Sequence, residues 1–157
     1  MERELRFMAE AIKEAFQGVK ENKGGPFGCV VVKGDEIIGR GHNSVTSLND
    51  PTAHAEVMAI RDACNKIGNF QLTDCEIYTT CEPCPMCMGA IYWARPGKVY
   101  YANTRLDAAT IGFDDSLIYE ELLLPIEKRK IAMQSLGRED AISLFNEWQI
   151  KEDKRVY

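Results

Sequence analysis

The chain has 157 residues, of which 45% are hydrophobic and 27% charged, enough apolar material for one ordinary domain and too little length for two. Its formal net charge of -5 does not attract phosphate backbones, which disfavours a nucleic-acid partner. No apolar run approaches the roughly 20 residues that span a bilayer, so we expect no membrane association. Six cysteines without an export signal favour a reducing cytoplasm, where metal binding explains cysteine clusters better than disulfides do.

The first part of the chain predicts a helix followed by a hairpin. Apolar side chains recur at helical spacing over residues 2–22, and a Gly-Gly-Pro segment ends that helix. Two runs rich in apolar residues, 27–33 and 36–41, flank a Gly-Asp turn. We therefore expect two antiparallel strands joined by that turn.

The polar residues 44–52 predict a loop that leads into a second helix. Asp50 is expected to cap this helix, and Pro51 is expected at its first position. The helix then runs over residues 53–66 and ends near Gly68.

The remainder predicts a crossover unit and a weaker C-terminal part. A strand at 75–80, a helix at 84–94 and a strand at 98–102 follow at the spacing of a parallel crossover. Beyond them we expect a fifth, weaker strand at 130–135 and a last helix at 139–151. The expected fold class is α/β, with three α/β/α layers in one domain over residues 1–157.

Three residues at the starts of two predicted helices form a candidate metal site. Cys84 and Cys87 are three apart, so both can reach one ion from one helix face, and a helix N-terminus favours the thiolate. His54 supplies an imidazole from the other helix. One His and two Cys make a three-ligand zinc set that leaves the fourth tetrahedral position open for water.

Glu56 is the candidate for moving protons at this site. Zinc lowers the pKa of a bound water to about 7, and a carboxylate can take that proton and deliver it to a ring nitrogen. His-x-Glu followed by Pro-Cys-x-x-Cys is the known signature of zinc nucleobase deaminases. On a regular helix, residues two apart diverge by about 200°. His54 and Glu56 therefore converge only if the helix end faces the site.

Other interpretations of the cysteines stay open. Cys84 and Cys87 alone form a redox-type Cys-x-x-Cys pair, which leaves Glu56 without a role. Adding Cys81 begins an iron–sulfur pattern, but position 91, where a fourth Cys is expected, is Ile. A closed structural zinc site with Cys81 as fourth ligand remains, unless Cys81 ends its strand and points elsewhere. The other three cysteines are expected to be small buried hydrophobes: Cys29, Cys64 and Cys75.

These motifs resemble the cytidine deaminase superfamily and, within it, the bacterial guanine deaminases, over essentially the full length. The supporting strings are GGPFG at 24–28, NDPTAHAE at 49–56, CEPCPMCMGAIYWARP at 81–96, GFDDS at 112–116 and the terminal Tyr157. The resemblance implies a five-stranded mixed sheet between helices, with the last two strands parallel. It also implies a homodimer that exchanges its C-terminal segments.

The resemblance also implies a substrate pocket. By position, Phe27 would stack on a purine, Asn43 would hydrogen-bond the base and Ala55 would belong to the binding site. The remaining assignments are Trp93 and Phe113 as pocket walls, Asp115 as a base contact and proton carrier, and Tyr157 as a cover over the neighbouring subunit's site. Each has a structural alternative: core for Phe27 and Trp93, a turn for Asn43, a helix cap for Asp115 and a frayed terminus for Tyr157.

The predicted function is zinc-dependent hydrolytic deamination of guanine to xanthine and ammonia, with attack at C2 while Glu56 protonates N3. A tRNA adenosine deaminase is the nearest alternative, but neither terminus carries the basic stripe that phosphates need. Deamination of cytosine or an aminopurine is a further alternative. From another class, the chain could be an inactive zinc-binding subunit, although retention of Glu56 speaks against that.

Overall fold

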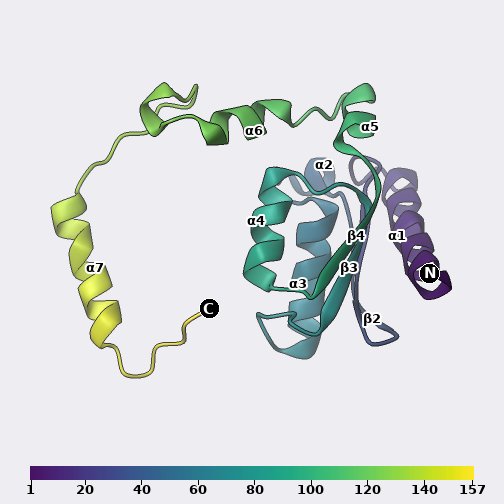
Figure 1. Cartoon of the computed structure of the whole chain (residues 1–157), viewed down its shortest axis with the longest axis horizontal. Coiled ribbons are helices and arrows are strands. Elements are labelled where there is room, and N and C mark those ends of the chain that lie inside the picture. The colour runs from purple at the N-terminus through teal and green to yellow at the C-terminus, as the bar shows by residue number, and fades with distance from the viewer. The chain divides into compact units, whose positions relative to one another are not determined.

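The computed structural model describes residues 1–157, which divide into two compact units, Met1–Asp115 and Ser116–Tyr157. The first unit contains the sheet and the helices that cover it (Figure 1). Its elements are α1 (Glu2–Lys20), β1 (Gly28–Lys33), β2 (Glu36–His42), α2 (Val45–Leu48), α3 (Ala55–Ile67), β3 (Cys75–Cys81), α4 (Pro85–Ala94), β4 (Lys98–Asn103) and α5 (Arg105–Thr110).

The strands form one mixed sheet in the order β2-β1-β3-β4. β1 pairs antiparallel with β2, with Gly28 opposite His42, which confirms the predicted hairpin. β1 also pairs antiparallel with β3, and β3 pairs parallel with β4 across α4, which confirms the predicted crossover. The start of α4 therefore follows directly on the carboxyl end of β3, and this edge of the sheet carries the candidate site.

Helices cover both faces of the sheet, as the three-layer prediction requires. On one face, α1 packs on Val30, Val32 and Tyr78. On the other face, α3 packs on Cys29, Val31 and further apolar side chains of the strands, and α4 contributes apolar side chains to the same cluster. Because strand side chains alternate between faces and both faces are buried, β1 reads as one continuous apolar run.

The predicted fifth strand at 130–135 is wrong, and the sheet has four strands instead of five. The backbone N–H of Lys130 donates to the Glu121 carboxylate at 2.6 Å, and the Arg129 side chain donates to the Leu124 carbonyl at 3.1 Å. Local contacts thus take the place of strand pairing in this segment. β4 is left as an edge strand of the sheet.

The predicted start of the second core helix is also wrong. Asp50 does not cap it, because its Oδ1 accepts hydrogen bonds from the Thr52 backbone N–H at 2.8 Å and the Thr52 hydroxyl at 2.7 Å. Such short-range side-chain bonds compete with helix formation and make a turn. α3 begins at Ala55 with His54 as its N-cap. The predicted loop at 44–52 also contains the short helix α2.

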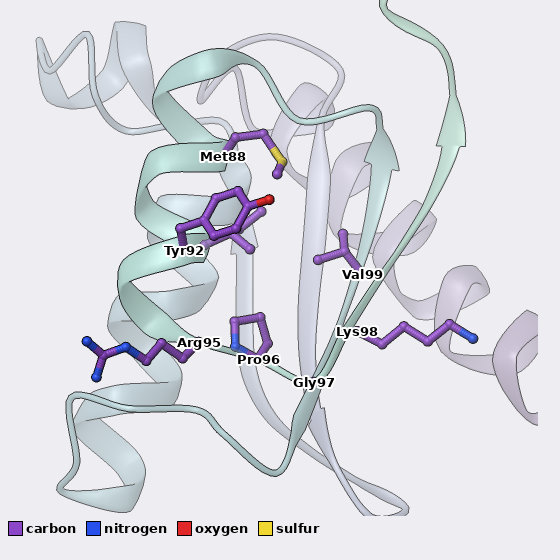
Figure 2. Close-up of a pocket in the computed structure, with 8 residues that line it drawn as sticks. Met88, Tyr92, Arg95, Pro96, Gly97, Lys98 and Val99 are labelled. Atoms are coloured by element: carbon purple, nitrogen blue, oxygen red, sulfur yellow. The ribbon is translucent and has the colours of Figure 1, made fainter.

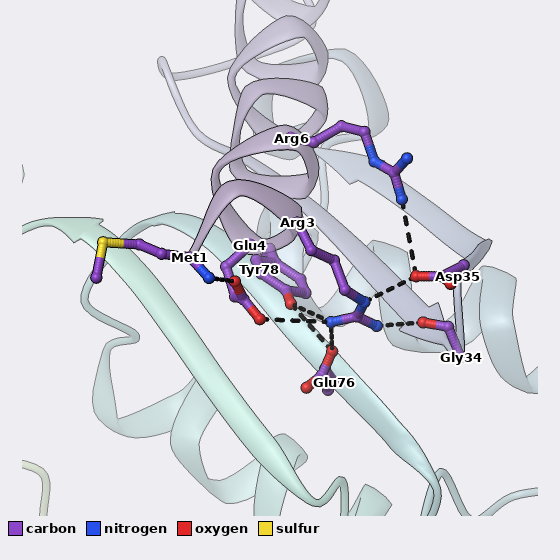
Figure 3. Close-up of polar contacts among 8 residues, drawn as sticks. All are labelled: Met1, Arg3, Glu4, Arg6, Gly34, Asp35, Glu76 and Tyr78. Atoms are coloured by element: carbon purple, nitrogen blue, oxygen red, sulfur yellow. Dashed lines mark hydrogen bonds and ion pairs between the residues drawn. The ribbon is translucent and has the colours of Figure 1, made fainter.

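Arg3 fastens the start of α1 to the sheet (Figure 3). Its guanidinium donates to the carboxylates of Glu76 at 2.7 Å and Asp35 at 2.8 Å, and to the Tyr78 hydroxyl at 3.2 Å. It also bonds the Gly34 carbonyl. One guanidinium thus joins α1 to β3 and to the turn between β1 and β2.

The second unit contains α6 (Ser116–Leu123), a 3-10 turn (Ile126–Lys128) and α7 (Arg138–Ile150). Large apolar side chains of this unit are exposed, among them Leu123, Phe145 and Ile150. The helix predicted at 139–151 is present, and exchange of this segment between subunits stays a prediction. None of the helices combines the length and apolar character needed to cross a bilayer.

Candidate metal centre and active site

Two helix N-termini carry the predicted metal ligands. His54 is the N-cap of α3, and Cys84 is the N-cap of α4 with Cys87 one turn further on. Both caps have extended backbone, so their side chains leave the helix end. The end of α3 is therefore what presents His54 and Glu56 together, which the helix side could not do.

The three side chains are brought together at the spacing that zinc requires. His54 Nδ1 lies 3.6 Å from Cys84 Sγ and 3.6 Å from Cys87 Sγ, and all three ligand atoms lie within 4.8 Å of one another. A tetrahedral zinc with Zn–S of about 2.3 Å and Zn–N of about 2.0 Å places nitrogen and sulfur about 3.5 Å apart. The residues fit a zinc ion, and Nδ1 is the imidazole nitrogen on that side.

The electrostatics of the cluster favour a thiolate. Hydrogen bonds from the Cys87 thiol and from His54 lower the pKa of Cys84 to about 4. The pKa of Cys87 is raised in turn, because its thiol donates a hydrogen bond to Cys84 and because the side chain is buried. Contact with Cys84 raises the pKa of His54. A negative charge is thus already stabilised where a cation would bind.

Glu56 lies next to the metal ligands and is almost wholly buried, with 6% of its surface exposed. Its Oε2 accepts from Cys87 Sγ at 3.3 Å, and its Oε1 accepts from the Thr79 hydroxyl at 2.9 Å. Burial raises the pKa of Glu56 above its ordinary value. A buried carboxylate beside a metal-ligand cluster has the position and the pKa direction of a general acid–base group.

Cys81 does not belong to the three-residue cluster. It is the last residue of β3, and its Sγ faces the Thr104 carbonyl at 3.5 Å. The structure thus favours the three-ligand site over the closed four-ligand one. Cys29 and Cys75 are buried, as predicted, and Cys64 is half-buried in contact with the same core.

Phe27, Phe113 and Asn43 gather around one loop. The rings of Phe27 and Phe113 meet edge to face with centroids 4.9 Å apart, and a Cβ on Gly25 would lie 2.8 Å from Phe113. The buried Asn43 accepts, through Oδ1, from the backbone N–H groups of Gly25 and Val45, both at 3.2 Å. Its predicted turn role is therefore present, and the oxygen of its carboxamide is already engaged.

Asp115 and Ala55 also lie in the first unit. Burial, followed by the charge of Cys84, raises the pKa of Asp115, which places this carboxyl within electrostatic reach of the cluster. Ala55 is fully buried in the first turn of α3, between His54 and Glu56.

The remaining two predicted pocket residues are Trp93 and Tyr157. Trp93 stands nine residues beyond Cys84 in α4, about 13 Å along the helix axis, and 63% of its surface is exposed. Tyr157 belongs to the second unit and is 66% exposed. Their roles as pocket wall and cover stay predictions.

A cavity of about 370 Å³ lies between α4 and β4 (Figure 2). Its walls are largely apolar, and the charged ends of Arg95 and Lys98 point away from it. Its lining residues are Met88, Ile91, Tyr92, Arg95, Pro96, Gly97, Lys98 and Val99. The lining contains none of the metal ligands and does not contain Glu56. This cavity is therefore not part of the candidate metal site.

Sequence reasoning missed Thr79, the hydroxyl that contacts Glu56. A signal was present, because Thr79 follows Ile77 at the alternate positions of β3 that face the core. A polar side chain at such a position needs a buried partner. Which partner it meets depends on α3, which lies far away in the chain.

The comparisons agree with this geometry. A family model, "Cytidine and deoxycytidylate deaminase zinc-binding region", matches residues 1–103. Guanine deaminase of Bacillus subtilis (strain 168) is 52% identical over 151 residues, which are 96% of this chain and 97% of that protein. The X-ray structure of Bacillus subtilis guanine deaminase superposes with a TM-score of 0.94 at 51% identity, covering 97% of each chain.

More partial matches are found to other members. The tRNA-specific adenosine deaminase of Streptococcus pyogenes (serotype M18) is 46% identical over 106 residues, covering 67% of this chain and 66% of that protein. A structure of guanine deaminase from Nitrosomonas europaea has a TM-score of 0.66 at 30% identity, covering 69% of this chain and 63% of that one. The family model and the near full-length relative establish that the chain belongs to the zinc-binding cytidine and deoxycytidylate deaminase family and groups within it with the guanine deaminases.

Proposed function

We propose that this protein catalyses the hydrolytic deamination of guanine to xanthine and ammonia. The observation that carries the reaction class is the buried Glu56 carboxylate, which contacts a three-residue zinc ligand set. The similarity to guanine deaminase over 96% of the chain supports guanine as the substrate.

His54, Cys84 and Cys87 would hold a zinc ion, which would offer an open coordination position and lower the pKa of a water there to about 7. Glu56 then moves the protons: it takes one from the attacking water, delivers it to N3 of guanine and helps to protonate the departing amine. The raised pKa of Glu56 suits the steps in which it acts as an acid. None of the six cysteines forms a disulfide, so we expect the protein to act in a reducing compartment such as the cytoplasm.

The substrate pocket is proposed around the loop that joins α1 to β1. Phe27 offers an aromatic face for stacking on the purine, and Phe113 supports that ring from its edge. The NH2 group of Asn43 is the end of the carboxamide left to donate to the base, because backbone donors occupy the oxygen. Asp115 is proposed to contact the base and to carry protons toward the leaving ammonia, and Ala55 to line the pocket beside Glu56.

We further propose a homodimer that exchanges its C-terminal segments. Leu5, Ile12, Phe16 and Val19 form an exposed apolar stripe on α1, and β4 is an unpaired edge. The second unit offers its own exposed apolar side chains. In such a dimer, Tyr157 would cover the neighbouring subunit's site and Trp93 would help to wall a pocket.

The tRNA adenosine deaminase alternative is not favoured. The Streptococcus pyogenes enzyme matches over 67% of this chain, against 96% for the guanine deaminase, and residues 138–157 carry more acidic than basic groups. Cytosine and aminopurine deamination differ from guanine deamination in the pocket and not in the zinc chemistry. They are separated by direct assay.

The experiment is ammonia release by zinc-loaded protein from guanine, with adenine, cytosine and a tRNA anticodon hairpin in parallel. Rapid release from guanine alone is the expected result. Release from another substrate but not from guanine would overturn the pocket assignment. Full zinc occupancy without release from any of the four would support the inactive-subunit alternative.

A further inference from the structure

We propose that Thr79 is a positioning residue for the deamination: its hydroxyl anchors Oε1 of Glu56 and leaves Oε2 as the oxygen that carries the transferred proton. This inference rests on the proposed function, because it concerns the carboxylate that moves protons there. It begins from the bond of 2.9 Å between the Thr79 hydroxyl and Oε1, in which both residues are buried.

The setting of Thr79 gives its hydroxyl no other evident purpose. The residue is fully buried in β3, on the face where Ile77 packs against α3. Valine has the same shape and would fill the position without a polar atom, so a hydroxyl there costs free energy unless it is bonded. Cys29 stands opposite Thr79 on β1, and its thiol is directed to the Val30 carbonyl. Glu56 is thus the group that satisfies the Thr79 hydroxyl.

The two oxygens of Glu56 have different surroundings. Oε1 accepts from Thr79, whereas Oε2 lies 3.3 Å from the ligand Cys87. When Oε2 takes a proton from the attacking water, Oε1 becomes the carbonyl oxygen of a carboxylic acid and still accepts from Thr79. The proton then leaves Oε2 for N3 of the ring. The Thr79 bond therefore persists through both transfers and keeps the proton-carrying oxygen toward the metal ligands.

Four substitutions test this role in the zinc-loaded full-length protein. Thr79→Val removes the hydroxyl and keeps the shape. Thr79→Ser and Thr79→Ala both lack the methyl group and differ from each other only in the hydroxyl. Thr80→Val is the matched control, because Thr80 is buried in the same strand and accepts from the Gly28 backbone N–H without touching Glu56.

We expect Thr79→Val and Thr79→Ala to retain zinc and a KM for guanine close to that of the wild type. Their kcat should fall roughly 10- to 100-fold. Thr79→Ser and Thr80→Val should stay close to wild type. A crystal structure of Thr79→Val should show the Glu56 carboxylate rotated from its wild-type position. If Thr79→Val does not fold, the role of the hydroxyl is tested by comparing kcat of Thr79→Ser with kcat of Thr79→Ala.

Unchanged kcat in Thr79→Ala, equal loss in Thr79→Ser, or equal loss in Thr80→Val would overturn the inference. Failure of the proposed function looks different, because wild-type protein with full zinc would then release no ammonia from guanine. In that case the orientation of the Glu56 carboxylate in the Thr79→Val crystal still decides whether Thr79 holds it. An unrotated carboxylate would end the proposal.

Discussion

Glu56 is a carboxylate that burial makes reluctant to ionise, although hydrogen bonds from Thr79 and Cys87 act in the opposite direction. It can therefore serve as base and as acid within one turnover. Glu56→Gln keeps the shape and removes the proton carrier. We expect it to retain zinc, measured by metal analysis, and to lose about 10²–10⁴-fold in kcat. A variant with near wild-type turnover would show that another group moves the protons.

The metal ligands could be predicted from the sequence at the scale of single residues, because a His and a Cys-x-x-Cys pair have few common uses besides metal binding and redox chemistry. Thr79 could not be predicted, since threonine is ordinary in a strand and only its contact with Glu56 distinguishes it. Asn43 shows the same limit, because a turn residue and a base ligand look alike until the two ends of its carboxamide are placed.

Among the elements, α3 has to lie close against β2 in order to present His54 and Glu56. Gly41 permits this approach, because a Cβ there would lie 2.4 Å from the Ala55 carbonyl oxygen and 2.5 Å from the Ala59 nitrogen. Gly41→Ala should displace the start of α3, destabilise the protein by about 1–3 kcal/mol and weaken zinc retention. Thermal unfolding and metal analysis measure both effects.

Gly89→Ala is the matched control for this element. Its Cβ meets nothing within 4 Å on α4, and replacing a helical glycine by alanine stabilises by roughly 0.5–1 kcal/mol. Normal zinc retention in Gly41→Ala would contradict the close-packing argument for α3.

The second element-scale prediction concerns α5, which leads into Phe113. Thr104 and Asp107 form a capping box, in which the Asp107 carboxylate accepts from the Thr104 backbone N–H at 2.8 Å. Phe113 is tied to the end of the same helix by its N–H, which donates to Ala108 at 3.0 Å. Asp107→Ala should fray α5 and raise KM for guanine without loss of zinc. Asp107→Glu, which can rebuild the box, should not.

The pH dependence of this cap has a definite sign. The Thr104 N–H and hydroxyl lower the pKa of Asp107 below its ordinary value of 3.8. The carboxylate therefore contributes its full stabilisation above the ordinary pKa and loses it only as the pH falls through the lowered one. The contribution of this cap to KM for guanine should consequently not change with pH near neutrality, and an effect of Asp107→Ala that fades at neutral pH would contradict the assignment.

For the whole molecule, subunit exchange predicts that two defective chains can complement each other. A chain with Glu56→Gln keeps Tyr157, and a chain without Tyr157 keeps Glu56. If the C-terminal segment crosses between subunits, a mixed dimer contains one site with both groups intact. Mixed subunits should then exceed either parent in ammonia release, and sedimentation should show a dimer. Mixtures no more active than their parents would place Tyr157 over its own subunit's site or nowhere near it.

The sequence by itself determined the hairpin, the parallel crossover and the metal-ligand set, and it singled out the carboxylate that lies beside the ligands. Each of these features has its own short pattern in the chain, either the periodicity of an element or the spacing within a motif. Such a pattern can be recognised without knowing the tertiary structure. The local pattern was wrong for Asp50, because its carboxylate bonds to Thr52 instead of capping the helix. It was also wrong for the strand at 130–135, where the backbone N–H of Lys130 bonds the Glu121 carboxylate instead of a neighbouring strand. Only the tertiary structure decided that His54 Nδ1 meets both sulfurs and that Thr79 meets Glu56. Such contacts join segments more than 20 residues apart, and their geometry is set by how closely a helix packs on a sheet.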